Sequence, residues 1–191
     1  MTQSAASADL LLEAARLTIA SRGSDKLTLS AVAAAAGVSR PTLYRWFPSK
    51  ADLLAALTVH ETDRFDAGLQ SAVAAHRTAA RKLDAALRYL VSYLDESLGA
   101  EAIGIDPAFA LQGLADELAP HVDILVRLLG EALARVPAVR NGALSREQAA
   151  EIFLRLAYSH YLVPHSDPEI LLAAMRSFAG LPPRSSMRAT G

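Results

Sequence analysis

The chain has 191 residues, of which 52% are hydrophobic and 20% charged, and its formal net charge is -1 at pH 7. This apolar content is enough for a substantial core, and the length suits one large or two small domains. The absence of cysteine excludes disulfide bonds and thiolate zinc sites, which fits a reducing cytoplasm. No stretch approaches the roughly 18 apolar residues of a membrane span, and the N-terminus lacks a basic start and an apolar run. We therefore expect a cytoplasmic protein without a membrane partner.

The first predicted element is a helix that ends near Arg22 and Gly23. Apolar residues recur at helical spacing before this point, which predicts one buried face. These residues are Leu11, Leu12, Ala15, Ile19 and Ala20. We expect this helix to brace the segment that follows it.

A second, short helix is predicted to run through Val32 and Ala36. Either Thr28 or Ser30 can accept a hydrogen bond from its first free N–H groups. Gly37 is expected to end the helix, because glycine adopts the left-handed conformation without a steric clash.

A third helix is predicted to begin at Ser39 or Arg40. Ser39 is a favourable cap and Pro41 suits the first turn, but a residue before proline avoids helical angles, so Arg40 is the alternative cap. With about 100° per residue, Leu43 and Phe47 share the inward side of this helix.

Two short helices joined by a glycine turn form a pattern typical of a DNA-reading helix-turn-helix. Arg40 and Thr42 carry the chemistry for base edges, whereas Tyr44, Arg45 and Lys50 are suited to phosphates. Between Arg40 and Lys50 there are three positive residues and no acidic one, which is the electrostatic signal of a DNA contact. Trp46 is expected at the boundary between core and groove. The predicted DNA-binding residues are Thr28, Ser39, Arg40, Thr42, Tyr44, Arg45 and Lys50.

Residues 8 to 60 resemble the N-terminal domain of the TetR/AcrR family of bacterial transcriptional regulators. The resemblance is carried by Thr28, Gly37-Val38-Ser39, Thr42-Leu43-Tyr44, Phe47 and Ser49-Lys50, followed by an apolar helix. It implies double-stranded DNA and a small-molecule effector as partners, a homodimer and, by family default, repression. Pro41 and Arg45 depart from the common family pattern, so the operator sequence does not follow from the resemblance.

After a break at Pro48-Ser49, a long helix is predicted to start at Lys50, with Leu53, Leu54 and Leu57 inward. Further helices are expected at about 78–98, 107–116, 118–136, 145–162 and 168–179. The breaks or first-turn residues between them are Gly99, Gly104–Pro107, Pro120, Pro137, Asn141-Gly142 and Pro164. No alternating stretch indicates strands. We therefore expect an all-α fold with a helix-turn-helix domain (1–50), a helical ligand-binding and dimerisation domain (51–180) and a disordered tail (181–191).

Two apolar stripes lie on the last two predicted helices and are the candidates for the dimer interface. Helical spacing places the residues of each stripe on one face, but both stripes could equally be buried within one chain. The family resemblance favours a four-helix dimer interface. Its candidate residues are Ile152, Phe153, Leu156, His160, Leu171, Met175 and Phe178.

The helices between about 60 and 140 are expected to enclose the effector pocket. Its candidate residues are Tyr89, Tyr93, Phe109, Leu111 and Leu114, although apolar stripes at helical spacing are more often plain core. The scarcity of charge on these faces favours an apolar or amphipathic effector.

Other functions have weaker signals. His160, His165 and Asp167, or His121 and Asp123, suggest a metal site, but neither group has the i, i+4 spacing that aligns two ligands on a helix. We expect no metal, no cofactor and no catalytic residue, because the common catalytic and nucleotide-binding motifs are absent. A helical ligand-binding or scaffold protein that no longer binds DNA is the main alternative, and an enzyme is a poorer one.

Overall fold

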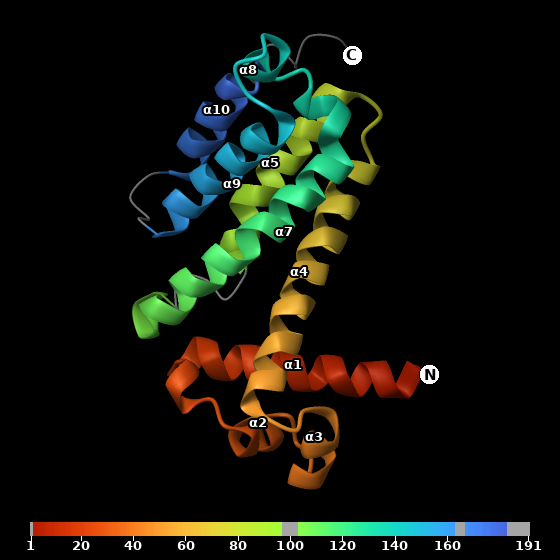
Figure 1. Ribbon diagram of the computed structural model, residues 1–191, viewed down its shortest axis with the longest axis vertical. Helices are drawn as coiled ribbons and strands as arrows, with labels where there is room; N and C mark the ends of the chain where they lie inside the picture. Colours follow the sequence, from red (N-terminus) through yellow and green to blue (C-terminus); the bar gives the residue numbers. More distant parts are fainter. Residues whose placement is uncertain (1, 97–102, 163–166, 183–191) are drawn as a thin grey trace. The chain divides into compact units, whose positions relative to one another are not determined.

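The computed structural model describes residues 2–96, 103–162 and 167–182, and all regular structure in these ranges is helical. The elements are α1 (Thr2–Arg22), the 3-10 helix η1 (Ser24–Lys26), α2 (Leu29–Ala35), α3 (Arg40–Trp46), α4 (Lys50–Ala74), α5 (Ala79–Glu96), α7 (Pro107–Leu133), α8 (Pro137–Arg140), α9 (Arg146–Leu162) and α10 (Pro168–Phe178) (Figure 1). The expected all-α fold class is confirmed. Among the described residues, no helix is both long and apolar enough to cross a membrane.

The chain forms two compact units. Within the described residues, the first unit contains 2–64 and 103–117, and the second contains 65–96, 118–162 and 167–182. Helices α4 and α7 each contribute one part to each unit. This is a division by packing, so the functional domain boundaries expected from the sequence remain a prediction.

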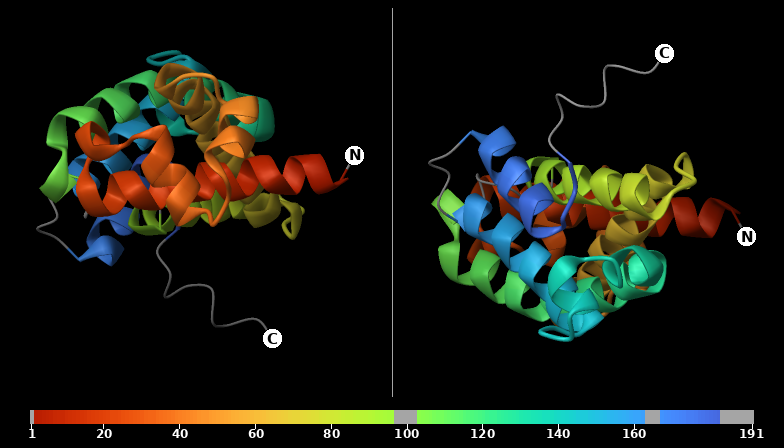
Figure 2. Two further views of the ribbon diagram at one scale, coloured as in Figure 1. Left: turned by 90° about the horizontal axis from the view of Figure 1, so that it is seen from below. Right: turned by 90° about the horizontal axis from the view of Figure 1, so that it is seen from above.

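The first unit is built around one apolar core. Helix α2 packs against α1 and α3, as the left view of Figure 2 shows. Completely buried side chains from three helices and the turn before α2 meet here, among them Ile19, Leu27, Leu43 and Leu53. Burial of each such side chain contributes about 1.5–3 kcal/mol. This core holds the short helices α2 and α3, which could not be stable alone.

In the second unit, α9 and α10 pack against each other and against α5 (Figures 1 and 2). A buried ion pair between Asp84 of α5 and Arg176 of α10 joins two of these helices, and Arg88 also donates to Asp84. The rings of Phe153 and Phe178 meet edge to face, with centroids 5.3 Å apart. Both polar and apolar contacts therefore fix α10.

Side-chain hydrogen bonds identify the cap at the two helix starts in the first unit for which the sequence offers two candidates. Thr28, not Ser30, caps α2, and its hydroxyl accepts a hydrogen bond from the Ala31 N–H at 3.1 Å. Ser39, not Arg40, caps α3, and its hydroxyl accepts one from the Thr42 N–H at 3.3 Å. Arg40 is thus the first residue of α3, and it starts the helix despite the proline that follows.

Gly37 makes the tight turn between α2 and α3. Its φ angle is +67°, a left-handed value that glycine adopts without strain. The N–H of Val38 donates to the Ala33 carbonyl at 3.0 Å, and the N–H of Gly37 donates to the Ala34 carbonyl at 3.2 Å. These two bonds close the end of α2.

The expected separation of helices 107–116 and 118–136 was wrong, because α7 continues through Pro120 as one helix from Pro107 to Leu133. A proline inside a helix removes one hydrogen bond and costs about 3 kcal/mol. The residues after it keep helical spacing and are buried at Ile124, Leu125 and Leu129. Their combined burial outweighs the local cost of the proline.

The first two residues of the expected tail are hydrogen-bonded to α10. The N–H of Leu181 donates to the Arg176 carbonyl at 2.9 Å, and the Arg176 guanidinium donates to the Pro182 carbonyl at 2.8 Å. The rest of the tail, together with the predictions made for Gly99, Pro164 and His165, lies outside the described residues.

Candidate functional site

Helix α3 has one buried side and one solvent-exposed side. Leu43 is completely buried and Phe47, just after the helix, is nearly so. Arg40, Tyr44 and Arg45 are exposed on α3. The inward and outward positions therefore agree with those expected from helical spacing. Leu43 and Phe47 hold α3 against the core, and the exposed side of the helix consists of other residues.

The start of α3 carries two linked hydroxyl groups. The Oγ of Ser39 lies 2.8 Å from the Oγ1 of Thr42, and either atom can be the donor. This contact fixes the Thr42 side chain in the first turn of α3, where Arg40 is exposed. The Thr42 hydroxyl would have to exchange or share this contact to hydrogen-bond a DNA base, whereas its methyl group would not.

Lys50 and Thr28 lie at the starts of the two neighbouring helices. The Lys50 ammonium donates to the carbonyl of Ser24 at 2.6 Å, which leaves two N–H donors for another partner. Thr28 is exposed, although its hydroxyl also caps α2. Both side chains therefore have structural roles besides any contact with a phosphate.

Asp52 is the first carboxylate after the segment from Arg40 to Lys50, and it forms part of a helix cap. Asp52 accepts hydrogen bonds from the N–H of Ser49 at 3.0 Å and from its hydroxyl at 2.7 Å. The Ser49 hydroxyl in turn accepts from the Asp52 N–H at 3.1 Å. This reciprocal cap fixes the start of α4.

Trp46 packs partly buried against the core of the first unit. Its indole Nε1 is buried and has no hydrogen-bond partner among the described residues. Trp46 therefore belongs mainly to the core side of α3.

The second unit contains an aromatic cluster formed by Phe65, Tyr89, Tyr93 and His121. The ring of Phe65 stacks on that of His121 with centroids 3.8 Å apart, and it meets the edge of Tyr93 at 5.1 Å. Tyr89 lies 5.6 Å from Phe65, and its hydroxyl donates to the Phe65 carbonyl at 3.1 Å. The cluster joins α4, α5 and α7 through aromatic contacts.

His121 brings an unsatisfied polar atom into this cluster. The side chain is only 1% exposed, and its Nδ1 lies 3.1 Å from the hydroxyl of Tyr158. Its Nε2 is buried and has no partner among the described residues. Burial lowers the pKa of His121 to about 4, so the ring is neutral at physiological pH. A buried nitrogen of this kind can bind a polar group of a ligand.

The five residues predicted for an effector pocket do not form one group. Tyr89 and Tyr93 meet in the aromatic cluster, with ring centroids 5.5 Å apart. Phe109 packs on the core of the first unit, and Leu111 and Leu114 belong to the same unit. Leu111 is 50% exposed. Sequence analysis missed His121 as a partner of the tyrosines, although its spacing to Leu125 already placed it on an apolar face.

The predicted dimer residues divide into buried and accessible ones. Phe153 and Met175 are completely buried within the chain, so these two do not offer surface to a partner. They were assigned to the interface because helical spacing identifies an apolar face but not what covers it. The half-buried residues that keep some accessible surface are Ile152, Leu156, His160, Leu171 and Phe178. Exposed Ile170, at 64%, adds to this surface on α10.

A metal centre gains no support from the geometry. In the described part of the chain, no group of three histidine, aspartate or glutamate side chains is arranged to hold a metal ion. His160 and Asp167 belong to different helix ends, and Asp167 caps α10 by accepting from the Glu169 N–H at 2.9 Å.

Comparison with known proteins relates the chain to bacterial regulators. Residues 11–57 match the family described as "Bacterial regulatory proteins, tetR family", and this range contains α2, α3 and the start of α4. The chain is 36% identical over 132 residues to the HTH-type transcriptional repressor LfrR of Mycolicibacterium smegmatis. That match covers 68% of this chain and 65% of the repressor, just under two thirds of its length.

Solved structures share the fold over most of the chain. The fatty acid degradation regulator FadR from Bacillus halodurans superposes with a TM-score of 0.67 at 21% identity, covering 90% of this chain and 93% of FadR. LfrR from Mycobacterium smegmatis in complex with proflavine gives 0.60 at 22% identity, with 91% and 94% covered. AibR in complex with isovaleryl coenzyme A and operator DNA gives 0.59 at 23% identity, with 88% and 95% covered.

Proposed function

Because the chain belongs to the TetR family of bacterial regulatory proteins, we propose that it is a ligand-responsive transcriptional repressor that binds DNA through α3. The observation that carries this proposal is the exposed cationic side of α3, with Arg40 and Arg45, within the matched segment. Arg40 and Thr42 lie at the N-terminal end of the helix, where a recognition helix contacts base edges. Tyr44, Arg45 and Lys50 would hold phosphates, with Thr28 and Ser39 at the adjoining helix starts.

We further propose that the chain acts as a homodimer on a palindromic operator. Two copies related by a twofold axis present two recognition helices, so each helix reads one half-site. The accessible parts of Ile152, Leu156, His160, Leu171 and Phe178 support an interface formed by α9 and α10. Since the proposed partner is chromosomal DNA, the protein would act in the bacterial cytoplasm.

The effector is proposed to bind at the aromatic cluster of the second unit. Tyr89 and Tyr93 supply aromatic surface, and the free Nε2 of His121 supplies one hydrogen-bonding atom. This combination suits a small apolar or amphipathic molecule with one polar group. Ligands in the structures of LfrR and AibR support effector control but do not identify the effector of this chain.

These roles assign residues 1–50 to DNA binding and residues 51–180 to ligand binding and dimerisation. For induction, the effector must bind the DNA-incompetent conformation more tightly, and DNA must weaken effector binding by the same factor. A coupling free energy of about 1–3 kcal/mol is ordinary for such a system.

The test is selection of genomic fragments by the purified full-length chain, followed by anisotropy titration of the enriched sequence. We expect a palindromic site that binds at least a thousandfold more tightly than scrambled DNA, about the lower limit for specific DNA-binding proteins. Equal affinity for enriched and scrambled DNA would refute a sequence-specific regulator. It would favour the alternative of a helical ligand-binding or scaffold protein.

A further inference from the structure

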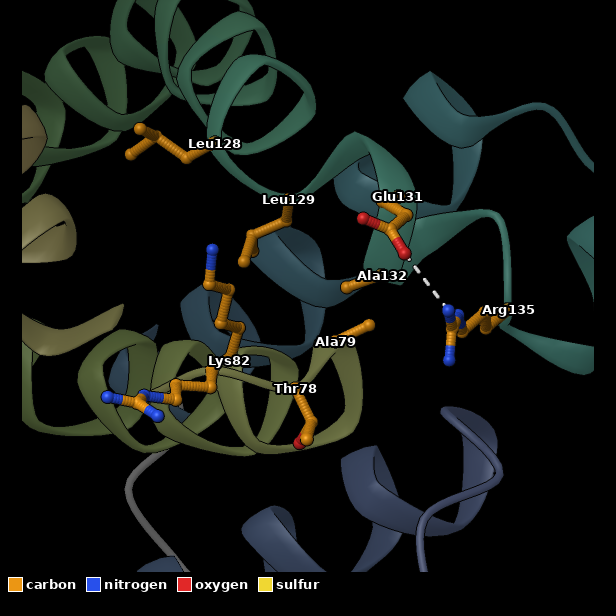
Figure 3. A pocket seen from close by; sticks show the side chains of 9 residues that line it. Thr78, Ala79, Lys82, Leu128, Leu129, Glu131, Ala132 and Arg135 are labelled. Atoms are coloured by element: carbon orange, nitrogen blue, oxygen red, sulfur yellow. Dashed lines mark hydrogen bonds and ion pairs between the residues drawn. The ribbon is translucent and has the colours of Figure 1, made fainter. Parts of the chain in front are cut away.

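The second unit has a cavity of about 280 Å³ between the start of α5 and the end of α7 (Figure 3). The residues that line it are Arg77, Thr78, Ala79, Lys82, Leu128, Leu129, Glu131, Ala132 and Arg135. Three of these side chains are cationic and one is a carboxylate. The lining therefore has an excess of two positive charges, in a chain whose formal net charge is -1.

Only one of the three cations has its charge balanced within the described residues. The Arg135 guanidinium pairs with Glu131 at 2.9 Å, and Figure 3 shows this pair on one side of the cavity. The side chains of Arg77 and Lys82 make no ion pair or hydrogen bond with any described residue. Two positive charges thus remain for a ligand.

The cavity is also lined by apolar side chains whose positions are fixed by packing. Leu129 and Ala132 of α7 are 2% and 3% exposed, so close packing fixes their positions. In Figure 3, Lys82 extends from α5 toward Leu129. Half-buried Leu128 keeps accessible apolar surface beside them, so a ligand would place a charged group near the cations and a short apolar part against α7.

We propose that this cavity binds the phosphate monoester group of a soluble small molecule. A dianionic phosphate matches the two unbalanced positive charges of Arg77 and Lys82. The volume is slightly below the range of about 300–1,000 Å³ typical of pockets for whole drug-sized ligands, so it fits a head group and a few carbons. The site is separate from the aromatic cluster and does not depend on the proposed DNA binding.

The experiment measures binding of inorganic phosphate to the full-length chain by calorimetry and by thermal unfolding. Sodium chloride keeps the ionic strength constant, because general charge screening also affects a partly exposed site. We expect phosphate to raise Tm where chloride at equal ionic strength does not. The double variant Arg77→Gln/Lys82→Gln should weaken phosphate binding about tenfold or more, as expected from the loss of two charge-assisted contacts.

Two further variants separate this site from general surface charge. Arg81→Gln removes an exposed cation of the same helix that does not line the cavity, so phosphate affinity should stay within about twofold. Glu131→Gln removes the only carboxylate of the lining and frees Arg135, so phosphate should bind more tightly. A gain of binding cannot result from misfolding.

The proposal is overturned if phosphate acts no more strongly than chloride, or if Arg81→Gln weakens binding as much as the double variant does. A second arm uses phosphatidylcholine vesicles with and without phosphatidic acid, which offers the same phosphate chemistry on a lipid. Binding of free phosphate without retention on the phosphatidic acid vesicles supports a soluble ligand. Retention that is lost in the double variant would instead overturn the soluble ligand in favour of a lipid headgroup.

Discussion

The carboxylate of Asp106 accepts hydrogen bonds from both donors of Ser24, from its N–H at 2.8 Å and from its hydroxyl at 2.5 Å. Its other oxygen accepts from the N–H of Phe109 at 3.2 Å and so caps α7. One side chain therefore links the start of α7 to the turn that precedes the helix-turn-helix. This link lies within the first unit and holds the start of η1 against the start of α7.

The Asp106 contacts predict a specific loss of stability in acid. The hydrogen bond from the Ser24 hydroxyl, followed by the backbone hydrogen bonds, lowers the pKa of Asp106. A carboxyl with a lowered folded pKa stabilises the protein above its unfolded pKa, and this stability disappears as pH falls through the folded value. Asp106→Asn should therefore reduce Tm at pH 7 but have less effect below about pH 4. Asp123→Asn, an exposed control on α7, should change Tm little at either pH.

The second prediction separates base reading from phosphate binding on α3. Arg40→Ala should cost about 1–3 kcal/mol and relax preference at one operator position in each half-site. Arg45→Ala and Lys50→Ala should weaken binding to all sequences alike. Each should also reduce, by roughly one, the slope of the logarithm of the binding constant against the logarithm of salt concentration. Anisotropy titrations with operator and scrambled DNA at several salt concentrations measure both effects.

The matched control for these DNA measurements is Arg140→Ala, which removes an exposed cation in the second unit. It should leave DNA affinity unchanged. Lys50→Ala also removes the hydrogen bond to Ser24, so the helical content of this variant must be checked. Arg45→Ala is therefore the better test of a phosphate contact. The assignment of roles is wrong if Arg40→Ala and Arg45→Ala affect operator and scrambled DNA equally.

A third prediction concerns the contact between Gly68 of α4 and Tyr89 of α5. A Cβ atom at position 68 would clash with the Tyr89 hydroxyl oxygen and would lie 2.7 Å from its Cζ, so Gly68→Ala should displace the ring. We expect a loss of about 1–3 kcal/mol in the free energy of unfolding, typical of overpacking. The control is Gly113→Ala in α7. Apart from its chain neighbours and the adjoining helix backbone, no atom of the described residues lies within 4 Å of the added Cβ. This change should be neutral or stabilise by up to about 1 kcal/mol, and equal losses would contradict the steric explanation.

The fourth prediction rests on two titrating groups of α7 with opposite effects. Burial lowers the pKa of His121 from 6.5 to about 4. Its neutral ring therefore stabilises the fold above pH 6.5, and this stability is lost as pH falls toward 4. The shift corresponds to about 3 kcal/mol. His121→Gln should remove this rise of stability with pH.

Glu117 acts in the reverse direction. Burial, reinforced by the charges of Glu61 and Asp116, raises the pKa of Glu117 from 4.5 to about 7. Its protonated form stabilises the fold below pH 4.5, and about 3 kcal/mol is lost as pH rises through 7. Between pH 4.5 and 6.5 the two effects largely cancel, so the wild type should show little pH dependence there from these groups. Urea unfolding across pH 4–8 should show rising stability in Glu117→Gln and falling stability in His121→Gln, and identical profiles would refute both assignments.

The fifth prediction tests the proposed interface on α9 and α10. Leu156→Glu places a charge on a half-buried position of this surface, and burial of an unpaired charge at an interface is costly enough to split a dimer. Sedimentation should then show monomers for Leu156→Glu but dimers for Ala143→Glu, a change at an exposed position outside α9 and α10. A wild type that is monomeric at micromolar concentration would end the interface proposal and the palindrome that depends on it.

The sequence alone determined the features that depend on bonds between near neighbours. The left-handed turn at Gly37 lies within a few residues of the helices that it separates. The sequence also limits each cap to two neighbouring candidates, Thr28 or Ser30 and Ser39 or Arg40, and the structure then selects Thr28 and Ser39. The inward positions of Leu43 and Phe47 follow from helical spacing. These signals are local, so the all-α class and the geometry of α2 and α3 could be predicted without knowledge of distant contacts.

Only the tertiary structure decided which partner covers each apolar face. Burial after Pro120 keeps α7 continuous, Phe109 joins the core of the first unit, and Phe153 and Met175 are covered within the chain. His121 stacks on Phe65, which lies far from it in the sequence. Helical spacing shows that a face is apolar, but the free energy of its burial comes from residues that the spacing cannot identify.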